Sequence, residues 1–517
     1  MPSPPRVVCI TLDSAEQSLL RQWVYQGLLP QFGKLLEESV SSATRNPEII
    51  YSGTLWASFS TGDWPGRHDH YFPLQPDSQG YGLRRFLPEH LSVDSVWNTI
   101  AQQGHRVALI DVPKARIARN SRTLQVSYWG EHEVLHPLTC WPPSLEQEVQ
   151  QVAGKDPVGK CDLVRQRPHE LGRLKAGLIE RATRRADLAL AVLARGPWDL
   201  FMLNFSEAHC AGHHLWAARD PTHPQYRPAF RSVLGEDPLL DVYQAIDRGL
   251  GRIVDALGRD TFLLVLATHG MGPRYDATAA LDSVLRRLDG IDEPRACQLV
   301  ETVRKRWLQL PGTVRGPFRR VADLLYDAPR QRERATRRFF AIPTTDSCGG
   351  VRLNLRGREP NGQVEPGPPY HDLCDWLERE LLSLVNVATG APVVARILRG
   401  DLLFAGPFRN QFPDLVIEWN HEAAIPAVRS PCVGELRVES LNSRTGDHRP
   451  KGLVLARCPD LAPHALEGEM ALVDLAPTLA ARLGVEVSGI DGKPILDFLP
   501  QQSSRLRPSC IHPQSRL

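Results

Sequence analysis

Residues 200–214 read LFMLNFSEAHCAGHH, and this stretch decides the fold. It opens with a short, almost wholly apolar run, which is typical of a strand buried on both faces. The polar segment that follows contains His209 and His213, four positions apart. On a helix this spacing places both imidazoles on one face, where they can bind one metal ion. Because 17 histidines produce such pairs by chance, the pair gains its weight from following a buried strand.

The same alternation of apolar runs and helical patterns extends in both directions from this stretch. Buried strands separated by helices predict an α/β fold, with a mostly parallel central sheet that helices cover on both faces. The strands are expected at Val7–Leu12, 106–112, Leu200–Phe205 and 261–267, and the helices at 15–38, 93–103, 169–195 and 241–257.

Metal-binding or acid–base side chains follow three of these predicted strands. Asp13 comes directly after the first strand, Glu207 and His209 follow the strand that ends at Phe205, and His269 follows the run that ends at Ala267. Active residues of parallel sheets lie just past the carboxyl ends of the strands. We therefore expect these side chains at one edge of the sheet.

Residues 273–399 differ from the rest of the chain, because they combine an arginine-rich helical segment (304–338) with a turn-rich one (356–369). We predict an inserted cap within a core formed by residues 1–272 and 400–500, followed by a tail at 501–517. The arginines are expected on a solvated helix face, or alternatively as cations for an anionic substrate. Within the returning core, strands are expected at 412–419 and 452–456 and a helix at 470–483.

Bulk composition excludes several classes of protein. The 517 residues have a formal charge of only +2, so no global field attracts nucleic acid or a membrane. The sequence shows neither a signal segment nor an apolar run long enough to span a bilayer. Its ten cysteines form no Cys-x-x-Cys pair and are expected as single core residues. We expect a soluble, cytoplasmic protein.

Several short motifs are spread in sequence order along nearly the whole chain. They are Asp13 at a strand end, Leu29-Pro30-Gln31-Phe32, Thr61-Gly-Asp-Trp-Pro-Gly-Arg-His68, Ala267-Thr-His-Gly-Met271, Thr445-Gly-Asp-His448, and a closing helix and turn at 472–484 and 491–494. Together they resemble the type I phosphodiesterase and nucleotide pyrophosphatase branch of the alkaline phosphatase superfamily. The resemblance implies an alkaline phosphatase-like core, with the cap as an insertion.

The resemblance also implies a nucleophile and a metal site. The family's nucleophile lies nine residues before the Thr of Thr-Gly, which here is Ser52, with Thr54 as the neighbouring alternative and a turn-forming serine as the non-catalytic one. The family commonly binds two metal ions, usually zinc. The positions that match its ligands are Asp13, His209, His213, His269 and His448.

The chain departs from the family pattern at two carboxylate positions. Thr268 replaces the carboxylate before His269, and His209 replaces the one four residues before His213. Fewer negative charges weaken the binding of a second divalent ion, so we expect one or two ions, with Glu207 as a further candidate ligand or base. His209, His213 and His448 are expected to hold one ion, and Asp13 and His269 a weaker second ion beside Ser52.

The expected reaction is hydrolysis of a small-molecule phosphate ester, in which metal-activated Ser52 attacks phosphorus and water cleaves the phosphoseryl intermediate. Arg67, His68 and His70 are candidates for substrate contacts, or are loop residues. A sulfatase is disfavoured, because Cys140-Trp-Pro-Pro-Ser144 lacks the required Arg. A phosphomutase, a phosphonate hydrolase, a transferase or a binding protein with a degenerate site stays open. So do substrate identity, monoester or diester choice and oligomeric state.

Overall fold

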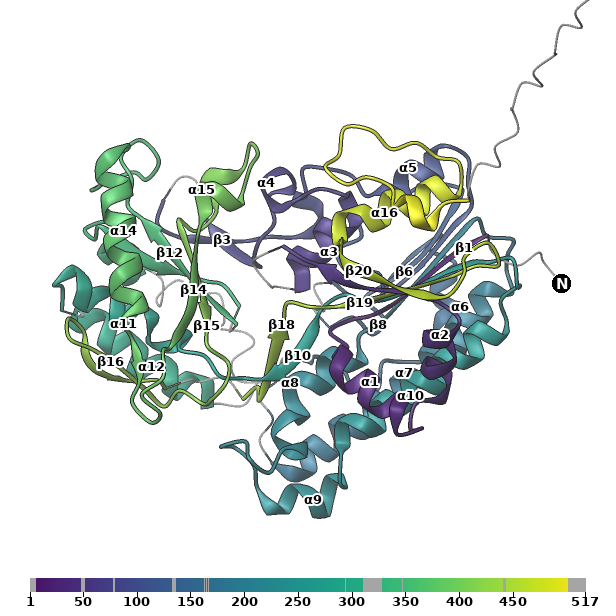
Figure 1. Cartoon of the computed structure of the whole chain (residues 1–517), viewed down its shortest axis with the longest axis horizontal. Helices are drawn as coiled ribbons and strands as arrows, with labels where there is room; N and C mark the ends of the chain where they lie inside the picture. Colours follow the sequence, from purple (N-terminus) through teal and green to yellow (C-terminus); the bar gives the residue numbers. More distant parts are fainter. Residues whose placement is uncertain are drawn as a thin grey trace, which may run out of the picture.

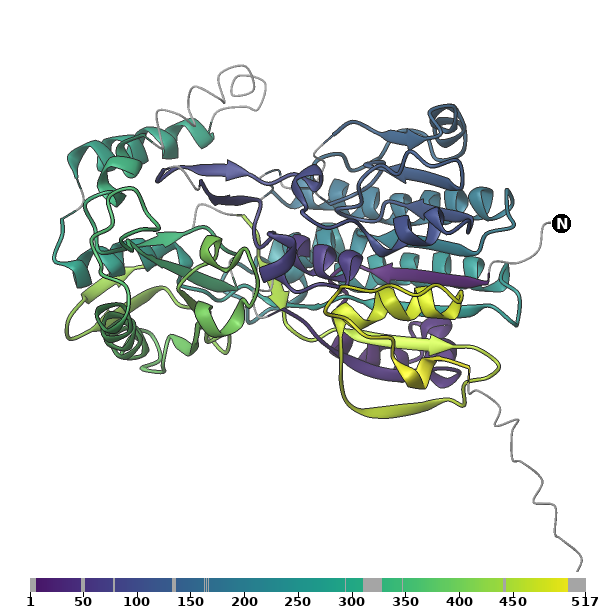
Figure 2. The ribbon, with the colours of Figure 1, turned by 90° about the horizontal axis from the view of Figure 1, so that it is seen from above.

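A computed structural model gives the fold of the chain as two lobes, a large sheet-based core and a smaller second lobe (Figure 1, Figure 2). Helices and sheet of the core lie on the right in both views, and the second lobe lies on the left. The described residues are 6–47, 52–77, 80–132, 136–161, 163, 165, 167–292, 294–309, 328–345, 347–439 and 443–500.

The core is built on a nine-stranded sheet in which five adjacent strands are all parallel. Only β19 and β7 run against their neighbours. This confirms the predicted mostly parallel α/β fold. The strand order is β20 (His464–Ala471), β2 (Val40–Arg45), β19 (Leu453–Arg457), β9 (Phe262–Ala267), β1 (Val7–Leu12), β8 (Leu200–Phe205), β5 (Val107–Ile110), β6 (Thr123–Ser127) and β7 (Thr139–Trp141).

Helices cover both faces of the sheet, and β1 shows why. Successive side chains of a strand point to opposite faces. Val8 and Ile10 therefore pack into one apolar cluster, while Val7 and Cys9 pack into another. Figure 1 shows these helices below and above the sheet. The first face carries α1 (Gln17–Tyr25), α2 (Pro30–Glu37), α7 (Pro168–Leu193) and α10 (Pro238–Asp255), and the second carries α3 (Ser52–Thr61), α5 (Val96–Gln102) and α16 (Leu472–Arg482).

The single helix predicted over 15–38 is two helices in the structure, α1 and α2. Gly27 has φ 71°, a left-handed conformation that glycine adopts without the steric cost of a Cβ. Pro30 then occupies the first position of α2, where its missing N–H needs no helical partner. The glycine ends the first helix and the proline begins the second, so the continuous apolar periodicity conceals a turn.

The second lobe has its own sheets and its own apolar core. It includes strand β15 (Leu415–Trp419), which pairs with β12 and β14 and not with the central sheet. The expectation that residues 412–419 return to the core is therefore wrong, and the lobe extends past residue 399 to β17. Its other elements are α11 (Thr278–Asp289), α12 (Arg295–Gln309), β11 (Phe339–Ile342), β12 (Cys348–Leu353), α14 (Pro368–Leu382), β13 (Val385–Asn386), β14 (Val394–Arg399), α15 (Gly400–Leu403), β16 (Ala427–Ser430) and β17 (Gly434–Arg437).

Arginines at the end of the predicted arginine-rich segment form ion pairs inside the lobe. Arg337 is buried and lies 2.9 Å from Asp282 and 3.5 Å from Glu333. Arg338 pairs with Asp289 at 2.7 Å. Arg337 therefore departs from the expected solvated face, whereas Arg306, Arg332 and Arg338 are exposed, as expected. Residues 310–327 of the segment lie outside the described part of the chain.

A short antiparallel pair, β10 (Gly270–Pro273) and β18 (Gly446–Arg449), lies where the chain leaves the core and where it returns (Figure 1). Its register sets Met271 opposite His448. Among the described helices, none is both long and apolar enough to cross a bilayer. The remaining core elements are β3 (Leu74–Pro76), β4 (Leu83–Arg85), α4 (Pro65–His68), α6 (Leu145–Val152), α8 (Glu207–Arg219) and α9 (Pro228–Leu234).

Candidate functional site

The predicted histidine pair lies on helix α8, which begins two residues after strand β8 ends. His209 and His213 are both buried, and their ring centroids are 4.7 Å apart. Nearly all of α8 is buried, because α10 and α7 pack against it on the core side and β10 and β18 on the other. The strand end and the enclosed helix together fix the direction of the two imidazoles.

Two further histidines join this pair from other strand ends. His448 of β18 lies 4.9 Å from His213 and 5.0 Å from His209, measured between ring centroids. His269, just past β9, lies 4.6 Å from His448. The pairing of β10 with β18 brings them together, since His269 directly precedes β10. We call His209, His213, His269 and His448 the histidine cluster.

Asp13 and Ser14 extend from the end of β1 into the histidine cluster. Asp13 Oδ2 lies 3.0 Å from His209 Nδ1, and Trp56 Nε1 donates to Asp13 Oδ1 at 3.3 Å. Ser14 Oγ lies 3.0 Å from His209 Nδ1 and 2.7 Å from His269 Nε2. Ser14 has φ 55°, a left-handed conformation unusual for a residue with a Cβ. The turn therefore directs both side chains towards the cluster.

Burial disfavours the charged forms of His213, His269 and His448. It lowers the pKa of His213 and of His448 well below the usual value, and neighbouring cationic groups add to the effect. Burial also lowers the pKa of His269 to about 3. Burial alone would raise the pKa of Asp13, but the charge of His209 and its hydrogen bond hold it below the usual range. Neutral imidazoles and an ionised carboxylate are the states that bind metals.

The hydrogen bonds of His209 and His213 leave one nitrogen of each ring as a metal donor. His213 Nδ1 donates to the Gly446 carbonyl at 2.8 Å, and His209 Nδ1 donates to ionised Asp13. Both Nε2 atoms are buried and have no hydrogen-bond partner among the described residues. In metal-binding histidines, Nδ1–H usually donates to an acceptor of the protein, and the lone pair of Nε2 binds the metal.

Ligand atoms come within metal-bridging distance in two overlapping groups. In each group the candidate atoms lie within 4.8 Å of one another. Imidazole with carboxylate is a donor set that suits zinc and similar divalent ions. The residues therefore fit a metal centre of the expected type. The groups are His209, His269 and His448, and His213, Asp447 and His448.

Sequence reasoning missed Asp447 and Ser14 and treated Thr268 only as a lost ligand. Asp447 directly precedes His448, and its carboxylate offers a charge that the family pattern places elsewhere. Thr268 Oγ1 lies 2.9 Å from His269 Nδ1, so its hydroxyl orients the ring. The sequence held a signal for Asp447, since it adjoins a matched ligand, but it held none for the turn at Ser14.

The two candidate nucleophiles lie at the beginning of α3. Ser52 is the first residue of this helix, and its side chain lies outside the described part of the structure. One turn later, Trp56 donates to Asp13, so this end of α3 adjoins the end of β1. The hydroxyl of Thr54 is buried and donates to the Tyr71 carbonyl at 2.5 Å. Thr54 thus has a structural hydrogen bond.

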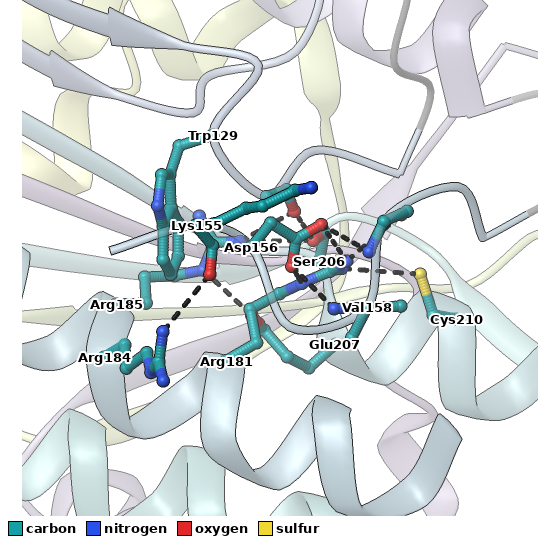
Figure 3. A network of polar contacts seen from close by, with 12 residues as sticks. Trp129, Lys155, Asp156, Val158, Arg181, Arg184, Arg185, Ser206, Glu207 and Cys210 are labelled. Carbon is teal, nitrogen blue, oxygen red and sulfur yellow. Dashed lines mark hydrogen bonds and ion pairs between the residues drawn. The ribbon is translucent and has the colours of Figure 1, made fainter. Parts of the chain in front are cut away.

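Glu207 points into a buried ion network on the core side of α8 (Figure 3). Its Oε1 accepts from Arg185 Nε at 2.9 Å, and Arg185 Nη1 lies 2.6 Å from Asp111 Oδ2. Arg185 also donates to the Gly130 carbonyl at 2.7 Å. The structure therefore places Glu207 in a salt bridge that supports the first turn of α8.

The candidate substrate contacts are engaged within the protein. Arg67 lies 3.0 Å from Asp491 and 3.3 Å from Asp63, which ties α4 to the closing turn of the chain. His68 is buried, its Nε2 lies 2.9 Å from Ser58 Oγ, and burial lowers its pKa to about 3. His70 is buried against Phe86, with ring centroids 4.5 Å apart. All three side chains therefore make contacts that stabilise the fold.

A fourth strand end, which sequence reasoning overlooked, supplies His132. This residue follows β6, and its ring stacks on His209 with centroids 3.7 Å apart. Cys210 and Cys161 lie beside it, so two of the cysteines expected as isolated core residues are neighbours. The alternating pattern of residues 123–127 was the available signal for the strand.

Comparisons with known proteins identify a family and similar folds. Residues 7–373 match the model of the type I phosphodiesterase / nucleotide pyrophosphatase family. Phosphonoacetate hydrolase from Sinorhizobium meliloti 1021, in complex with phosphonoformate, has a similar structure, with TM-score 0.53 and 14% identity over 93% of this chain and 96% of that one. Murine ectonucleotide pyrophosphatase/phosphodiesterase 5 gives TM-score 0.50 and 13% identity over 94% and 97%. At this identity the likenesses show the fold alone. No curated protein matches the chain.

Proposed function

Because the chain belongs to the type I phosphodiesterase / nucleotide pyrophosphatase family, it is a hydrolase of the phosphoester class, and we propose that it cleaves a small-molecule phosphate ester in a metal-dependent reaction with Ser52 as the nucleophile. The observation that carries the proposal is the histidine cluster. Four buried imidazoles from three segments converge beside Asp13, and two of them keep free Nε2 lone pairs.

The metal ligands that we propose are Asp13, His209, His213, His269 and His448, joined by Asp447. A divalent cation held there supplies Lewis acidity, which favours the alkoxide of a serine and neutralises charge on phosphoryl oxygens. Zinc is the ion that the imidazole-rich donor set favours. Glu207 is the weakest candidate of the predicted set, because its salt bridge to Arg185 already uses one carboxylate oxygen.

The residues of the chain have separate roles in this proposal. Ser52, at the beginning of α3, attacks phosphorus, and the positive end of the helix attracts the phosphoryl oxygens. Asp13 accepts a hydrogen bond from His209 Nδ1 and so keeps Nε2 available. Thr268 orients His269 through Nδ1, and Ser14 Oγ lies 2.7 Å from Nε2, the nitrogen that would bind the metal. The hydrogen bond of Thr54 to the Tyr71 carbonyl supports Ser52 as the nucleophile.

Substitution of Ser52 tests this proposal. Metal-free enzyme is reconstituted with Zn²⁺, Mn²⁺ or Mg²⁺ and assayed on bis(p-nitrophenyl) phosphate and p-nitrophenyl phosphate. We expect activity only with a divalent ion, and Ser52→Ala should lower kcat on the order of 10³-fold or more while retaining its bound metal. Thr54→Val is the matched control and should retain turnover if it folds. Undiminished turnover in Ser52→Ala, or full activity without metal, would contradict the proposal.

A further inference from the structure

Two buried cysteines and a histidine form a second cluster of soft ligands beside the histidine cluster. Cys161 Sγ, Cys210 Sγ and one ring nitrogen of His132 all lie within 4.8 Å of one another. Both cysteines are buried, and His132 is half-buried. We propose that these three residues bind a thiophilic divalent cation of the zinc type, at a site additional to the metal centre of the proposed function.

The geometry is close to that of a tetrahedral thiolate site. Bonds of about 2.3 Å to sulfur and about 2.0 Å to nitrogen, at tetrahedral angles, separate neighbouring sulfur and nitrogen ligands by about 3.6 Å. Cys210 Sγ and His132 Nδ1 are 3.8 Å apart. Cys210 and His132 therefore need only small side-chain movements to reach bonding distance, and Cys161 Sγ lies within 4.8 Å of both.

The charges around this position nearly balance. Arg181 Nη1 lies 3.9 Å from Cys210 Sγ, and the same guanidinium pairs with Asp156 at 2.8 Å. Two thiols bind the dication by releasing two protons to solvent, which leaves the metal–dithiolate unit neutral. The Arg181–Asp156 pair is also neutral overall. The buried site therefore carries little net charge when it is filled.

Rigid connections hold the ligands in place before any ion binds. Asp156 accepts from the backbone N–H groups of Val158 and Gly159, which shapes the turn that leads to Cys161 (Figure 3). Arg181 fastens this turn to α7, and Cys210 extends from the facing side of α8. A preorganised pair of thiols on separate elements is the arrangement expected of a metal ligand set and is unusual for core packing alone.

His132 is half-buried, so a fourth ligand to the ion, such as water, would come from the solvent side. Three protein ligands with one open position distinguish this cluster from a closed structural zinc site. His132 also stacks on His209, and Cys210 is adjacent to His209 in sequence. An ion bound at Cys161, Cys210 and His132 would thus fix one face of the His209 imidazole.

Cobalt binding tests the proposal, because thiolate-to-cobalt charge transfer gives an intense near-ultraviolet band that imidazole and carboxylate ligands do not give. Reduced, metal-free full-length protein is titrated with Co²⁺. We expect the band in the wild type, and its loss together with one equivalent of bound Co²⁺ in Cys161→Ala and in Cys210→Ala. His132→Ala should keep the band but weaken Co²⁺ binding at least tenfold. Cys374→Ala, which removes a buried cysteine of the second lobe, should change neither.

Two results would overturn this assignment, the absence of the band from the wild type or its persistence in both cysteine variants. If the variants do not fold, zinc X-ray absorption of the wild type decides the question. Sulfur neighbours at about 2.3 Å support the site, and nitrogen and oxygen neighbours alone refute it. A Cys161–Cys210 disulfide in protein purified under reducing conditions, detected by mass spectrometry, also refutes it. If the histidine cluster binds no metal, the charge-transfer band remains, so the two proposals fail separately.

Discussion

The two sides of helix α8 differ in how far their buried polar atoms are paired by hydrogen bonds. On the side of β18, His209 Nε2 and His213 Nε2 have no hydrogen-bond partner among the described residues. On the core side, the guanidinium of Arg185 contacts Asp111, Glu207, the Gly130 carbonyl and Ser206, while Glu207 Oε2 is buried without a hydrogen-bond partner among the described residues. An unpaired buried polar atom costs free energy, whereas a fully paired one costs little. The unsatisfied side therefore indicates where a ligand acts, and the more fully paired side indicates what supports it.

The first substitution removes the imidazole of His213 from the side of α8 that faces β18. His213→Ala should lower turnover on the order of 10³-fold and abolish the stabilisation that Zn²⁺ gives the wild type, because it removes a proposed ligand. That stabilisation is expected to be about 2.7 kcal/mol at a free Zn²⁺ concentration one hundred times the Kd. Thermal denaturation with and without Zn²⁺ measures it. His223→Ala is the matched control, because His223 is buried and also bonds a backbone carbonyl, that of Thr445. Equal zinc stabilisation in both variants would argue against the ligand assignment.

The second substitution removes the guanidinium from the ion network on the core side of α8. Arg185→Met leaves Asp111 and Glu207 buried without their cation, and removing one partner of a buried ion pair costs about 3–5 kcal/mol. Urea denaturation should show this loss, without any dependence on Zn²⁺. Arg252→Met is the control, since Arg252 makes a half-exposed ion pair with Asp187 of α7, so its loss should cost about 1 kcal/mol or less. A similar small loss for Arg185→Met would mean that the network does not support α8.

The sequence predicted the parts of this contrast that depend on local pattern. The strands β1, β8 and β9 and the helices after them follow from apolar runs and periodicity, and parallel strand ends explain why Asp13, His209 and His269 meet. His448, 179 residues beyond His269 in the chain, was found only through the family motif.

The parts that the sequence did not reveal depend on pairing over long distances. Arg185 lies in the middle of α7, and nothing in its neighbourhood indicates that it meets Asp111 and Glu207. Cys161 and Cys210 are 49 positions apart and form no motif. The second lobe extends past residue 399 because β15 pairs with β12 and β14, and strand partners of an antiparallel sheet are not encoded in the strand itself.

The third prediction concerns His68, a buried histidine whose ring nitrogens are both hydrogen-bonded. Burial lowers its pKa to about 3, against about 6.5 in an unfolded chain. The unfolded state therefore binds the extra proton first, and stability should fall as the pH drops from about 6.5 towards 3. One proton contributes about 1.4 kcal/mol per pH unit.

His68→Asn removes this titration and keeps an oxygen that can accept the His70 N–H. Urea denaturation between pH 7 and pH 4.5 should show a slope shallower than the wild type by up to that amount. His464→Asn, at an exposed histidine of β20, is the control and should leave the slope unchanged. If His68→Asn and the wild type have the same slope, His68 binds its proton as readily in the folded protein as in the unfolded chain, and the prediction is wrong.

The smallest expected effect comes from restoring a carboxylate to the unsatisfied side. Thr268 Oγ1 is 2.9 Å from His269 Nδ1, so the carboxylate of Thr268→Asp can occupy the same place and accept the Nδ1 proton. A carboxylate partner makes the opposite nitrogen a better donor, and such partners change metal affinity by about tenfold or more. Zinc titration should show tighter binding of the weaker ion and a stoichiometry closer to two. Thr268→Asn keeps the shape without the charge and should show neither change. If both variants bind zinc as the wild type does, the missing carboxylate is not what limits the second ion, and Asp447 already provides the charge.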